Sequence, residues 1–247
     1  MLELNKIYNE DCIEGMNRIP DSSIDMVFCD LPYGTTNCKW DSILDLDKLW
    51  EQYRRVVKKA GAVVLTAAQP FTSVLISSNI KEFKYCWVWE KSKATGYLNA
   101  KKMPLRSHED VCIFYRNFPT YNPQMTKGTP YFKGTALRET DVYGKQKITT
   151  VENTDGLRYP RTNIYFKTAE SEGKVVHPTQ KPVALVEYFI KTYSNPGDVV
   201  LDTCMGSGST AIACMNQRRN FIGFELDKEY YDKASLRISK HNIPLFT

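Results

Sequence analysis

The chain has 247 residues, of which 42% are hydrophobic and 25% charged, a composition that excludes wholesale disorder and collagen-like or mucin-like repeats. Its length allows one large α/β core or two small domains, and we expect one catalytic domain that carries an insertion. The net charge of +5 is mild, so it permits a polyanionic partner without requiring one.

The seven cysteines show neither CxxC spacing nor paired clusters. This pattern predicts no disulfide framework and no zinc or other metal site, and it is typical of a reducing compartment. Met1 is followed by the charged stretch LELNKIYNED, and no apolar run approaches about 18 residues. We therefore expect a soluble, cytoplasmic protein.

Strand and helix signals alternate in the first half of the chain. Short apolar runs rich in β-branched and aromatic residues predict strands, and apolar residues at helical spacing predict helices. In chain order we expect a strand at 24–30, a helix at 45–61, a strand at 62–68, a helix at 70–80, and strands at 85–91 and 111–116.

The pattern fails between residues 117 and 174, which are polar and rich in Gly, Thr and Tyr. An irregular stretch of this length within a compact domain is typical of a functional insertion. Regular signals then return as a helix at 181–194, a strand at 198–204, a helix at 208–219, a strand at 220–227 and a helix at 228–242. We predict an α/β fold with a doubly wound, mostly parallel sheet, built from residues 1–116 and 175–247, with an insertion at 117–174.

The stretch VVLDTCMGSGSTAIACMNQ joins a predicted strand to a predicted helix through a glycine turn. The strand ends at Asp202, Gly206 and Gly208 allow a ligand to approach the backbone closely, and a helix that opens at Ser209 or Thr210 favours anionic groups. The stretch has neither the G-x-x-x-x-G-K-[ST] loop nor the third glycine of G-x-G-x-x-G.

The next strand improves the case for nucleotide binding. Glu225 ends this strand about twenty residues after the turn, where an acid can accept hydrogen bonds from both hydroxyls of a ribose. The alternative is an ordinary β-α-β packing unit in which Glu225 is a solvated strand end.

The stretch CDLPYG follows the predicted strand at 24–30. An exocyclic amine of adenine or cytosine is a poor nucleophile, and a carboxylate from Asp30 and a carbonyl from Leu31 could accept its two N–H bonds and orient it. Pro32 fixes the turn, and Tyr33 offers a ring on which a base could stack. The alternative is a polar turn with Tyr33 packed on the surface.

Residues 81–116 combine eight Lys or Arg and four acids with several aromatic side chains. This mixture suits a phosphate backbone and exposed bases. The alternative is a solvated face beside a buried tryptophan strand.

The two motifs together resemble the DNA amino-methyltransferases that use S-adenosylmethionine, which carry a (D/N/S)-P-P-Y motif and an F-x-G-x-G cofactor motif. Their order, with the catalytic motif first, is similar to the beta class of that family. The resemblance extends to YNEDC (8–12), NAKKMPLRSHEDVCIFYR (99–116), HPTQKPVALVEYFI (177–190) and FIGFELDKEYY (221–231). Leu31 replaces the first proline of the catalytic motif, and Thr203 and Cys204 replace the usual Pro and Phe of the cofactor motif.

The resemblance implies a Rossmann-like methyltransferase fold with S-adenosylmethionine as cofactor. By position, it implies that Asp11 and Cys12 lie beside the adenine of the cofactor and that Glu225 holds the ribose. It also implies that Thr179, Gln180 and Lys181 hold the methionine end, with Lys181 meeting the carboxylate as a point charge. The remaining implied cofactor-binding residues are Asp202, Cys204, Gly206, Gly208 and Ser209.

The resemblance further implies double-stranded DNA as partner, with the target base flipped out of the helix. Arg106 and His108 lie where the family contacts DNA, and Lys91, Asn99 and Lys101 are weaker candidates of the same kind, for all of which a plain surface role is the alternative. The insertion, with nine Lys or Arg and six acids in residues 120–174, is the candidate for reading the target sequence; its alternatives are a lid or a dimer contact. For His177 we expect a satisfied turn histidine rather than a catalytic one. A homodimer and a cognate restriction endonuclease are further candidate partners.

The predicted activity is therefore that of a site-specific DNA N6-adenine methyltransferase, because cytosine-N4 enzymes of this family more often carry Ser at the position of Asp30. An N4-cytosine enzyme is the first alternative. A NAD-dependent oxidoreductase would use the glycine turn and Glu225 but gives no account of the Asp-Leu-Pro-Tyr turn. A catalytically silent DNA-binding module is a third alternative.

Overall fold

The computed structural model describes residues 2–34, 43–136, 139–142, 144–145 and 149–241. The chain divides into two compact units. The larger unit consists of Met1–Asn122 and Thr162–Thr247, and the smaller unit of Pro123–Arg161.

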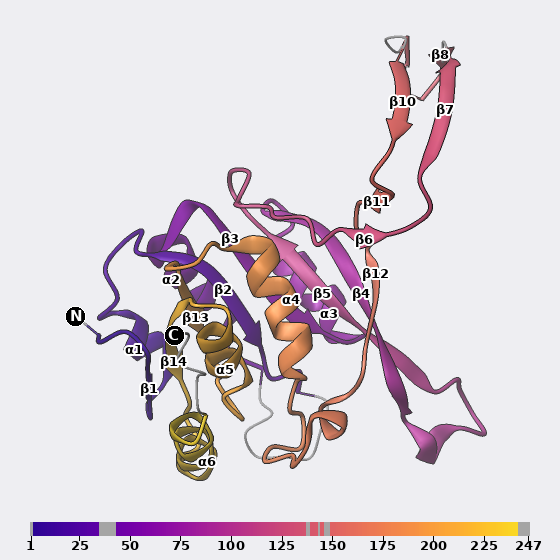
Figure 1. Cartoon of the computed structure of the whole chain (residues 1–247). Coiled ribbons are helices and arrows are strands. Elements are labelled where there is room, and N and C mark those ends of the chain that lie inside the picture. The colour runs from indigo at the N-terminus through magenta and orange to yellow at the C-terminus, as the bar shows by residue number, and fades with distance from the viewer. Residues whose placement is uncertain (1, 35–42, 137–138, 143, 146–148, 242–247) are drawn as a thin grey trace. The chain divides into compact units, whose positions relative to one another are not determined.

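The larger unit is built on a mixed sheet that has eight strands among the described residues (Figure 1). In spatial order the strands are β1 (Lys6–Tyr8), β14 (Asn220–Phe224), β13 (Val199–Asp202), β2 (Ile24–Asp30), β3 (Val57–Ala67), β5 (Arg106–Phe114), β4 (Phe83–Thr95) and β12 (Asn163–Phe166). Every neighbouring pair is parallel except the two pairs made by β5, which runs antiparallel to β3 and β4. The predicted doubly wound, mostly parallel α/β fold is confirmed.

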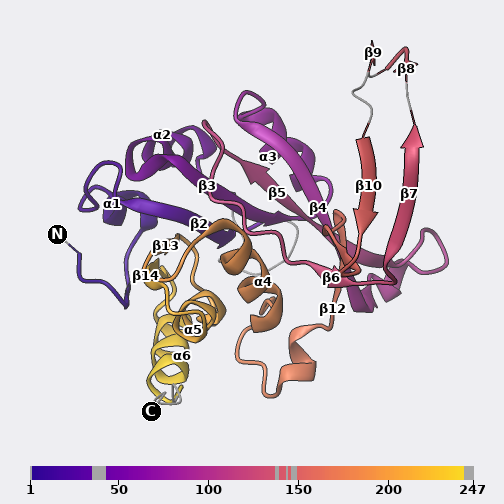
Figure 2. The same ribbon diagram turned by 45° about the horizontal axis from the view of Figure 1, so that its top comes forward.

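Helices pack on both faces of this sheet (Figures 1 and 2). They are α1 (Cys12–Met16), α2 (Leu46–Val56), α3 (Phe71–Ser78), α4 (Val183–Tyr193), α5 (Ser209–Asn216) and α6 (Lys228–Ser239). Side chains of β2 alternate between the two faces: Val27 and Cys29 belong to the core cluster under α2 and α3, whereas Met26 and Phe28 belong to the cluster under α4 and α5. This burial on both faces explains why the strand reads as a continuous apolar run.

Several predicted elements agree with the structure, whereas the boundary between the helix at 45–61 and the strand at 62–68 is wrong. The strand at 24–30 is confirmed with both ends in place. The helix expected at 45–61 ends at Val56, because Val57 is extended and already pairs with Ile24 of β2. The strand expected at 62–68 therefore begins earlier, because sheet pairing outweighs the helical spacing that Val57 continues.

The strands expected at 85–91 and 111–116 are parts of a longer antiparallel pair. The pairing of β4 with β5 continues past the apolar run to Trp89↔Glu109 and Glu90↔His108. The larger unit also has two short 3-10 helices. The helix η1 (Tyr97–Asn99) lies between β4 and β5, and η2 (Ala169–Glu172) lies between β12 and α4. Among the described residues, no helix is long and apolar enough to cross a membrane.

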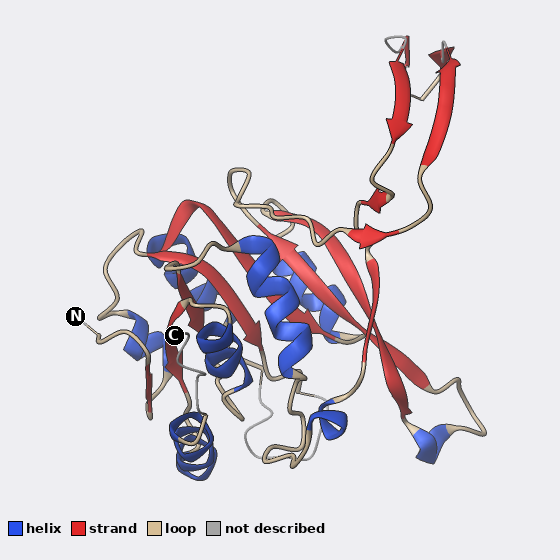
Figure 3. Ribbon diagram, in the orientation of Figure 1, coloured by secondary structure: helices blue, strands red, loops and turns tan. Residues whose placement is uncertain are grey.

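The smaller unit contains three antiparallel strand pairs among its described residues (Figure 3). The pairs are β7 (Tyr131–Ala136) with β10 (Thr149–Asn153), β6 (Thr126–Lys127) with β11 (Leu157–Arg158), and β8 (Glu139–Thr140) with β9 (Gly144–Lys145). The unit is shorter than the predicted insertion at 117–174, because β12 pairs in parallel with β4 and so belongs to the main sheet.

Candidate active site

A cavity of about 1020 Å³ lies in the larger unit where strands β2 and β13 end. In parallel sheets this edge is where ligands usually bind. The predicted catalytic and cofactor segments both line it, although they come from opposite ends of the sequence. The lining residues that the sequence predicted are Asp11, Cys12, Asp30, Leu31, Pro32, Tyr33, Lys91, Arg106, His108, Thr179, Gln180, Lys181, Asp202, Cys204, Gly206, Ser209 and Glu225.

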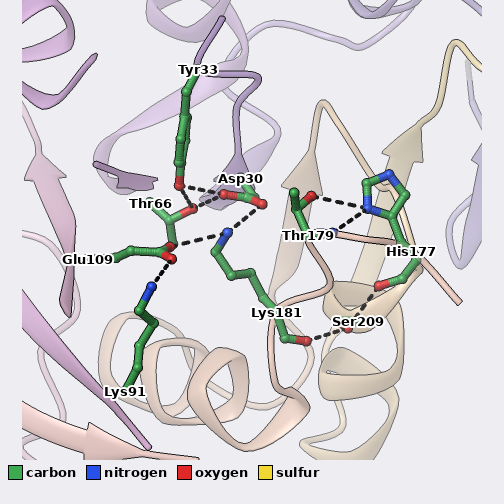
Figure 4. A network of polar contacts seen from close by, with 10 residues as sticks. Asp30, Tyr33, Thr66, Lys91, Glu109, His177, Thr179, Lys181 and Ser209 are labelled. Carbon is green, nitrogen blue, oxygen red and sulfur yellow. Dashed lines mark hydrogen bonds and ion pairs between the residues drawn. The ribbon is translucent and has the colours of Figure 1, made fainter. Parts of the chain in front are cut away.

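The carboxylate of Asp30 is held by three side chains (Figure 4). Its Oδ1 accepts hydrogen bonds from the hydroxyls of Tyr33, at 2.8 Å, and Thr66. Its Oδ2 lies 2.7 Å from the ammonium Nζ of Lys181. A carboxylate has about four acceptor positions, so these three contacts, counted among the described residues, leave one acceptor position on Oδ2.

Lys181 also belongs to a buried chain of alternating charges. Its Nζ lies 3.4 Å from Glu109 Oε2, and Lys91 Nζ lies 3.1 Å from Glu109 Oε1. The Lys181 and Lys91 side chains are only 9% and 6% exposed, so both ammonium groups depend on these carboxylates for stabilisation. Figure 4 shows the chain running from Asp30 through Lys181 and Glu109 to Lys91.

The pKa shifts of Lys181 and Glu109 favour the charged forms of both side chains. Burial alone would lower the pKa of Lys181, but Asp30 and Glu109 outweigh it, and the pKa is raised. Burial alone would raise the pKa of Glu109, but Lys181 and Lys91 outweigh it, and the pKa is lowered. Lys181 and Glu109 therefore stay ionised near neutral pH.

Tyr33 is fixed beside Asp30 by stacking as well as by its hydrogen bond. Its ring stacks on Phe71 with centroids 5.3 Å apart and an interplanar angle of 22°. Lys181 Nζ lies 5.6 Å from the centroid of the same ring. The side chain of Leu31 is 3% exposed and packs in the core, which holds the backbone of the turn in place.

The glycine turn after β13 has the backbone geometry that the sequence predicted. Gly206 and Gly208 both adopt positive φ angles, +53° and +78°, and α5 begins at Ser209. Positive φ is accessible to glycine without strain, so the chain can turn sharply at both positions, and Gly206 adds no side chain where it lines the cavity. Gly206 lines the cavity and Gly208 caps the helix behind it.

Glu225 closes one side of this turn. Its Oε2 accepts a hydrogen bond from the backbone N–H of Gly206 at 2.8 Å, and its Oε1 accepts one from the backbone N–H of Asp227 at 2.9 Å. The backbone N–H of Leu226 also acts on this carboxylate, so these three contacts, counted among the described residues, leave about one acceptor position for a ribose hydroxyl. Burial raises the pKa of Glu225.

Asp202 and the N-terminus of α1 form two further walls of the cavity. Asp202 is 3% exposed and accepts a hydrogen bond from the backbone N–H of Cys204 at 3.0 Å; burial raises its pKa to about 6. Asp11 caps α1 by accepting hydrogen bonds from the backbone N–H groups of residues 13 and 14, and Cys12 is 5% exposed. Both walls face the cavity.

The HPTQKP segment is held largely by its own contacts. His177 packs on Tyr230 with ring centroids 4.1 Å apart, and its Nδ1 lies 3.1 Å from the Thr179 hydroxyl, as expected for a satisfied turn histidine. Burial lowers the pKa of His177 to about 4. Gln180 accepts a hydrogen bond from the backbone N–H of Val176 at 3.1 Å. Lys181 was expected at the cofactor carboxylate, whereas the structure pairs it with Asp30 and Glu109.

The candidate DNA-contacting residues differ in exposure. Arg106 and His108 are exposed and line the cavity, and Asn99 and Lys101 are exposed outside its lining. Lys91 is buried against Glu109, which leaves little of its ammonium for a phosphate. Their contact with DNA stays a prediction.

Two polar residues of the site were missed from the sequence. Thr66 is a single polar side chain in the apolar run of β3, and that exception was a readable signal. Glu109 gave no such signal, because it was one acid in a polar stretch and its partners come from β4 and residue 181. Among the described residues, no cluster of three or more His, Cys, Asp or Glu could hold a metal ion.

The residues present fit a nucleoside-containing cofactor beside a planar amine. The glycine at 206 and the remaining acceptor capacity of Glu225 suit a ribose, and the last acceptor position of Asp30 suits one N–H. The cavity is at the upper end of the size range of small-molecule sites, about 300–1,000 Å³.

Comparisons with known proteins point to one family. The sequence model of the DNA methylase family, which covers N6 and N4 methyltransferases, matches residues 24–236. The Type II methyltransferase M1.MboII of Moraxella bovis is 27% identical over 270 residues, which cover 98% of this chain and 100% of that protein.

Solved structures of several DNA methyltransferases share the fold of this chain. The M1.HpyAVI–SAM complex superposes with a TM-score of 0.66 at 25% identity, covering 94% of this chain and 98% of that one. The PvuII DNA methyltransferase, described as cytosine-N4-specific, superposes with a TM-score of 0.67 at 17% identity, covering 96% and 87%, and shows the shared fold. A DNA modification methylase of Thermus thermophilus shows the same fold with a TM-score of 0.65 at 19% identity, covering 98% and 97%.

Proposed function

This chain belongs to the DNA methylase family, and we propose that within it the protein is a site-specific DNA N6-adenine methyltransferase. Family membership makes it a DNA amino-methyltransferase, an enzyme whose methyl donor is S-adenosylmethionine. The finer assignment is to the base and to the roles of the individual residues. The observation that supports the residue roles is the cavity that Asp30 shares with Gly206 of the glycine turn.

S-adenosylmethionine, when bound, supplies a methyl group on a sulfonium, an electrophile open to direct attack by an amine. We assign its ribose to Glu225, its adenine to the wall made by Asp11 and Cys12, and its methionine part to Asp202 and the HPTQKP segment. The charge of the sulfonium and the ammonium suits the carboxylate of Asp202. No covalent intermediate with the protein is needed.

Asp30 orients the target amine. The open acceptor position on its Oδ2 takes one N–H bond and the carbonyl of Leu31 takes the other, which concentrates the nitrogen lone pair and directs it toward the methyl donor. Tyr33 and Thr66 fix Oδ1, so the carboxylate cannot rotate away from the amine. The proton that the amine loses passes to solvent through the open cavity.

Adenine is supported by the carboxylate at position 30, since the cytosine-N4 enzymes of the family more often carry Ser there. The test is incubation of the protein and unmethylated DNA with labelled S-adenosylmethionine, followed by digestion to nucleosides. We expect label in N6-methyladenine. Label only in N4-methylcytosine would overturn the adenine assignment and leave the DNA amino-methyltransferase in place.

A base inside a duplex cannot reach an amine-binding site of this kind, so the target base has to flip out of the helix, which costs a few kcal/mol. We assign the reading of the target sequence to the strand pairs of residues 123–161, with Arg106 and His108 holding DNA near the cavity. Sequencing DNA from cells that express the protein, with detection of modified bases, identifies the site. A homodimer and a cognate restriction endonuclease stay predictions.

A further inference from the structure

The connection between β4 and β5 exposes an unusual group of apolar side chains. We call residues 93–106 the β4–β5 tip; it contains the 3-10 helix η1. Tyr97 is 77% exposed and Leu98 is 83% exposed, and Met103 and Leu105 are 56% and 46% exposed. Large apolar side chains gathered at such exposure are typical of a contact surface.

The charge of the β4–β5 tip narrows the choice of partner. Its sequence, KATGYLNAKKMPLR, holds four basic residues and no acid. All four basic side chains are exposed, namely Lys93, Lys101, Lys102 and Arg106. A surface that combines apolar side chains with positive charge alone is complementary to a polyanion with an apolar interior, which describes stacked bases between phosphates.

The β4–β5 tip is also ordered by its own backbone. The N–H of Asn99 bonds to the carbonyl of Gly96 at 3.0 Å, and Lys102 and Met103 both bond to the carbonyl of Asn99, at 2.8 and 3.0 Å. Gly96 turns the chain with a φ of +90°, which glycine adopts without strain. The exposed side chains are therefore presented by a preformed turn rather than by a loose loop.

The β4–β5 tip adjoins the candidate active site. Gly96, Tyr97 and Arg106 line the same cavity as Asp30. The strands that carry the tip also carry Lys91 and Glu109 of the buried charge chain. A partner that rests on Tyr97 would lie at the rim of this cavity.

We propose that Tyr97 and Leu98 form a wedge that enters the base stack of duplex DNA next to the flipped target base, while the basic residues of the β4–β5 tip hold the flanking phosphates. The proposal rests on the proposed function and adds a binding role for two residues that have none in it. The wedge fills the gap that the flipped base leaves, so it lowers the free energy of flipping. Met103 and Leu105 add further exposed apolar surface to the same tip.

The test compares two synthetic duplexes that contain the recognition site found by sequencing methylated DNA. In one duplex the target base faces its normal partner, and in the other it faces an abasic site, which makes flipping easier. For the double variant Tyr97→Ser/Leu98→Ser we expect kcat/KM on the normal duplex to fall at least about tenfold, and on the abasic duplex to fall by less than about threefold. The variant and the unmodified protein are assayed at the same salt concentration, because the strength of phosphate contacts depends on the salt concentration.

The control is Ile80→Ser/Leu236→Ser, which removes two apolar side chains that are 66% and 55% exposed away from the cavity lining. This control variant should leave kcat/KM unchanged on both duplexes. Equal losses on the two duplexes, or no loss, would overturn the wedge. So would a change in the oligomeric state of the Tyr97→Ser/Leu98→Ser variant in gel filtration, which would assign the tip to a second copy of the chain. Failure of the proposed function is distinct, since the unmodified protein would then transfer no methyl group to either duplex.

Discussion

The ammonium of Lys181 lies 2.7 Å from the carboxylate of Asp30, although the two residues come from opposite halves of the chain. The contact joins the HPTQKP segment to the catalytic turn. It also changes how the turn works, because one carboxylate oxygen is held by an ammonium before any substrate arrives. Asp30 is thus a positioned acceptor rather than a free side chain.

Replacement of Asp30 by alanine should remove most turnover and leave cofactor binding intact. The cofactor turn and Glu225 hold their geometry through contacts that do not include Asp30. Loss of one oriented hydrogen bond in a catalytic site typically lowers kcat about 10²–10³-fold. Calorimetry with S-adenosylmethionine and methyl-transfer assays on DNA provide the two measurements.

Asp47→Asn is the matched control for that variant, because Asp47 is an exposed acid in the first turn of α2. Its turnover should equal that of the unmodified protein. Near-normal turnover of Asp30→Ala would remove the amine-orienting role from Asp30.

Replacement of Lys181 by methionine should destabilise the fold strongly. The change leaves the partly buried carboxylates of Asp30 and Glu109, which are 21% and 16% exposed, without their shared buried ammonium, and breaking a buried ion pair typically costs about 3–5 kcal/mol. Lys58→Met is the control, because its ion pair with Asp25 is exposed on the lysine side (48%) and worth about 0–1 kcal/mol. Urea denaturation measures both, and equal losses would mean that the buried chain contributes no more than a surface pair.

Cofactor affinity should fall as the pH is lowered through about 6. Burial raises the pKa of Asp202 to about 6, so below that pH the group is neutral and no longer attracts a cationic cofactor. The effect on folding has the opposite sign: the folded state binds the proton more tightly than the unfolded state, whose pKa is 3.8, so this group's contribution to stability falls as the pH rises from 3.8 to about 6.

The variant Asp202→Asn tests whether Asp202 itself, rather than a neighbouring group, causes this pH dependence of cofactor affinity. The amide keeps an oxygen for the backbone N–H of Cys204 and cannot ionise. Calorimetric titration at several pH values should show a flat affinity for the variant near pH 6. His177 titrates at about pH 4, so it does not account for an inflection near 6. Persistence of the inflection in Asp202→Asn would assign it to another group, of which Glu225 is the first to test because its pKa is also raised.

Replacement of Gly156 by alanine tests the role of the smaller unit. Gly156 has a φ of +71°, and a Cβ there would lie 2.2 Å from the carbonyl oxygen of Gly128, so the turn between β10 and β11 has to shift. If residues 123–161 read the target sequence, methylation of DNA should fall while cofactor binding stays unchanged. Gly128→Ala is the control, since its Cβ would meet its nearest neighbour at an ordinary 3.4 Å. Unchanged methylation and site choice in Gly156→Ala, with local distortion shown by hydrogen exchange, would count against the reading role.

Local patterns predicted the fold well and the element ends less well. The apolar run of β2 and the glycine turn before α5 follow from the backbone preferences of their own residues, and both are confirmed. The end of α2 could not be predicted, because Val57 continues the helical spacing of the residues before it and pairs instead with Ile24 of a distant strand. Pairing with a distant strand is invisible in a window of a few residues.

Local backbone geometry and hydrophobic periodicity were enough to predict the alternation of strands and helices, the turn that presents Asp30 and Tyr33, and the glycine turn with Glu225 after it. The pairing of Lys181 with Asp30 and Glu109, and the burial of Lys91 against Glu109, could be seen once the chain was folded and not before. The reason is physical: burial raises the free energy of an isolated charge, so ionic partners are selected by which side chains share a cavity once the sheet has formed, and that sharing has no signature in the spacing of residues along the chain.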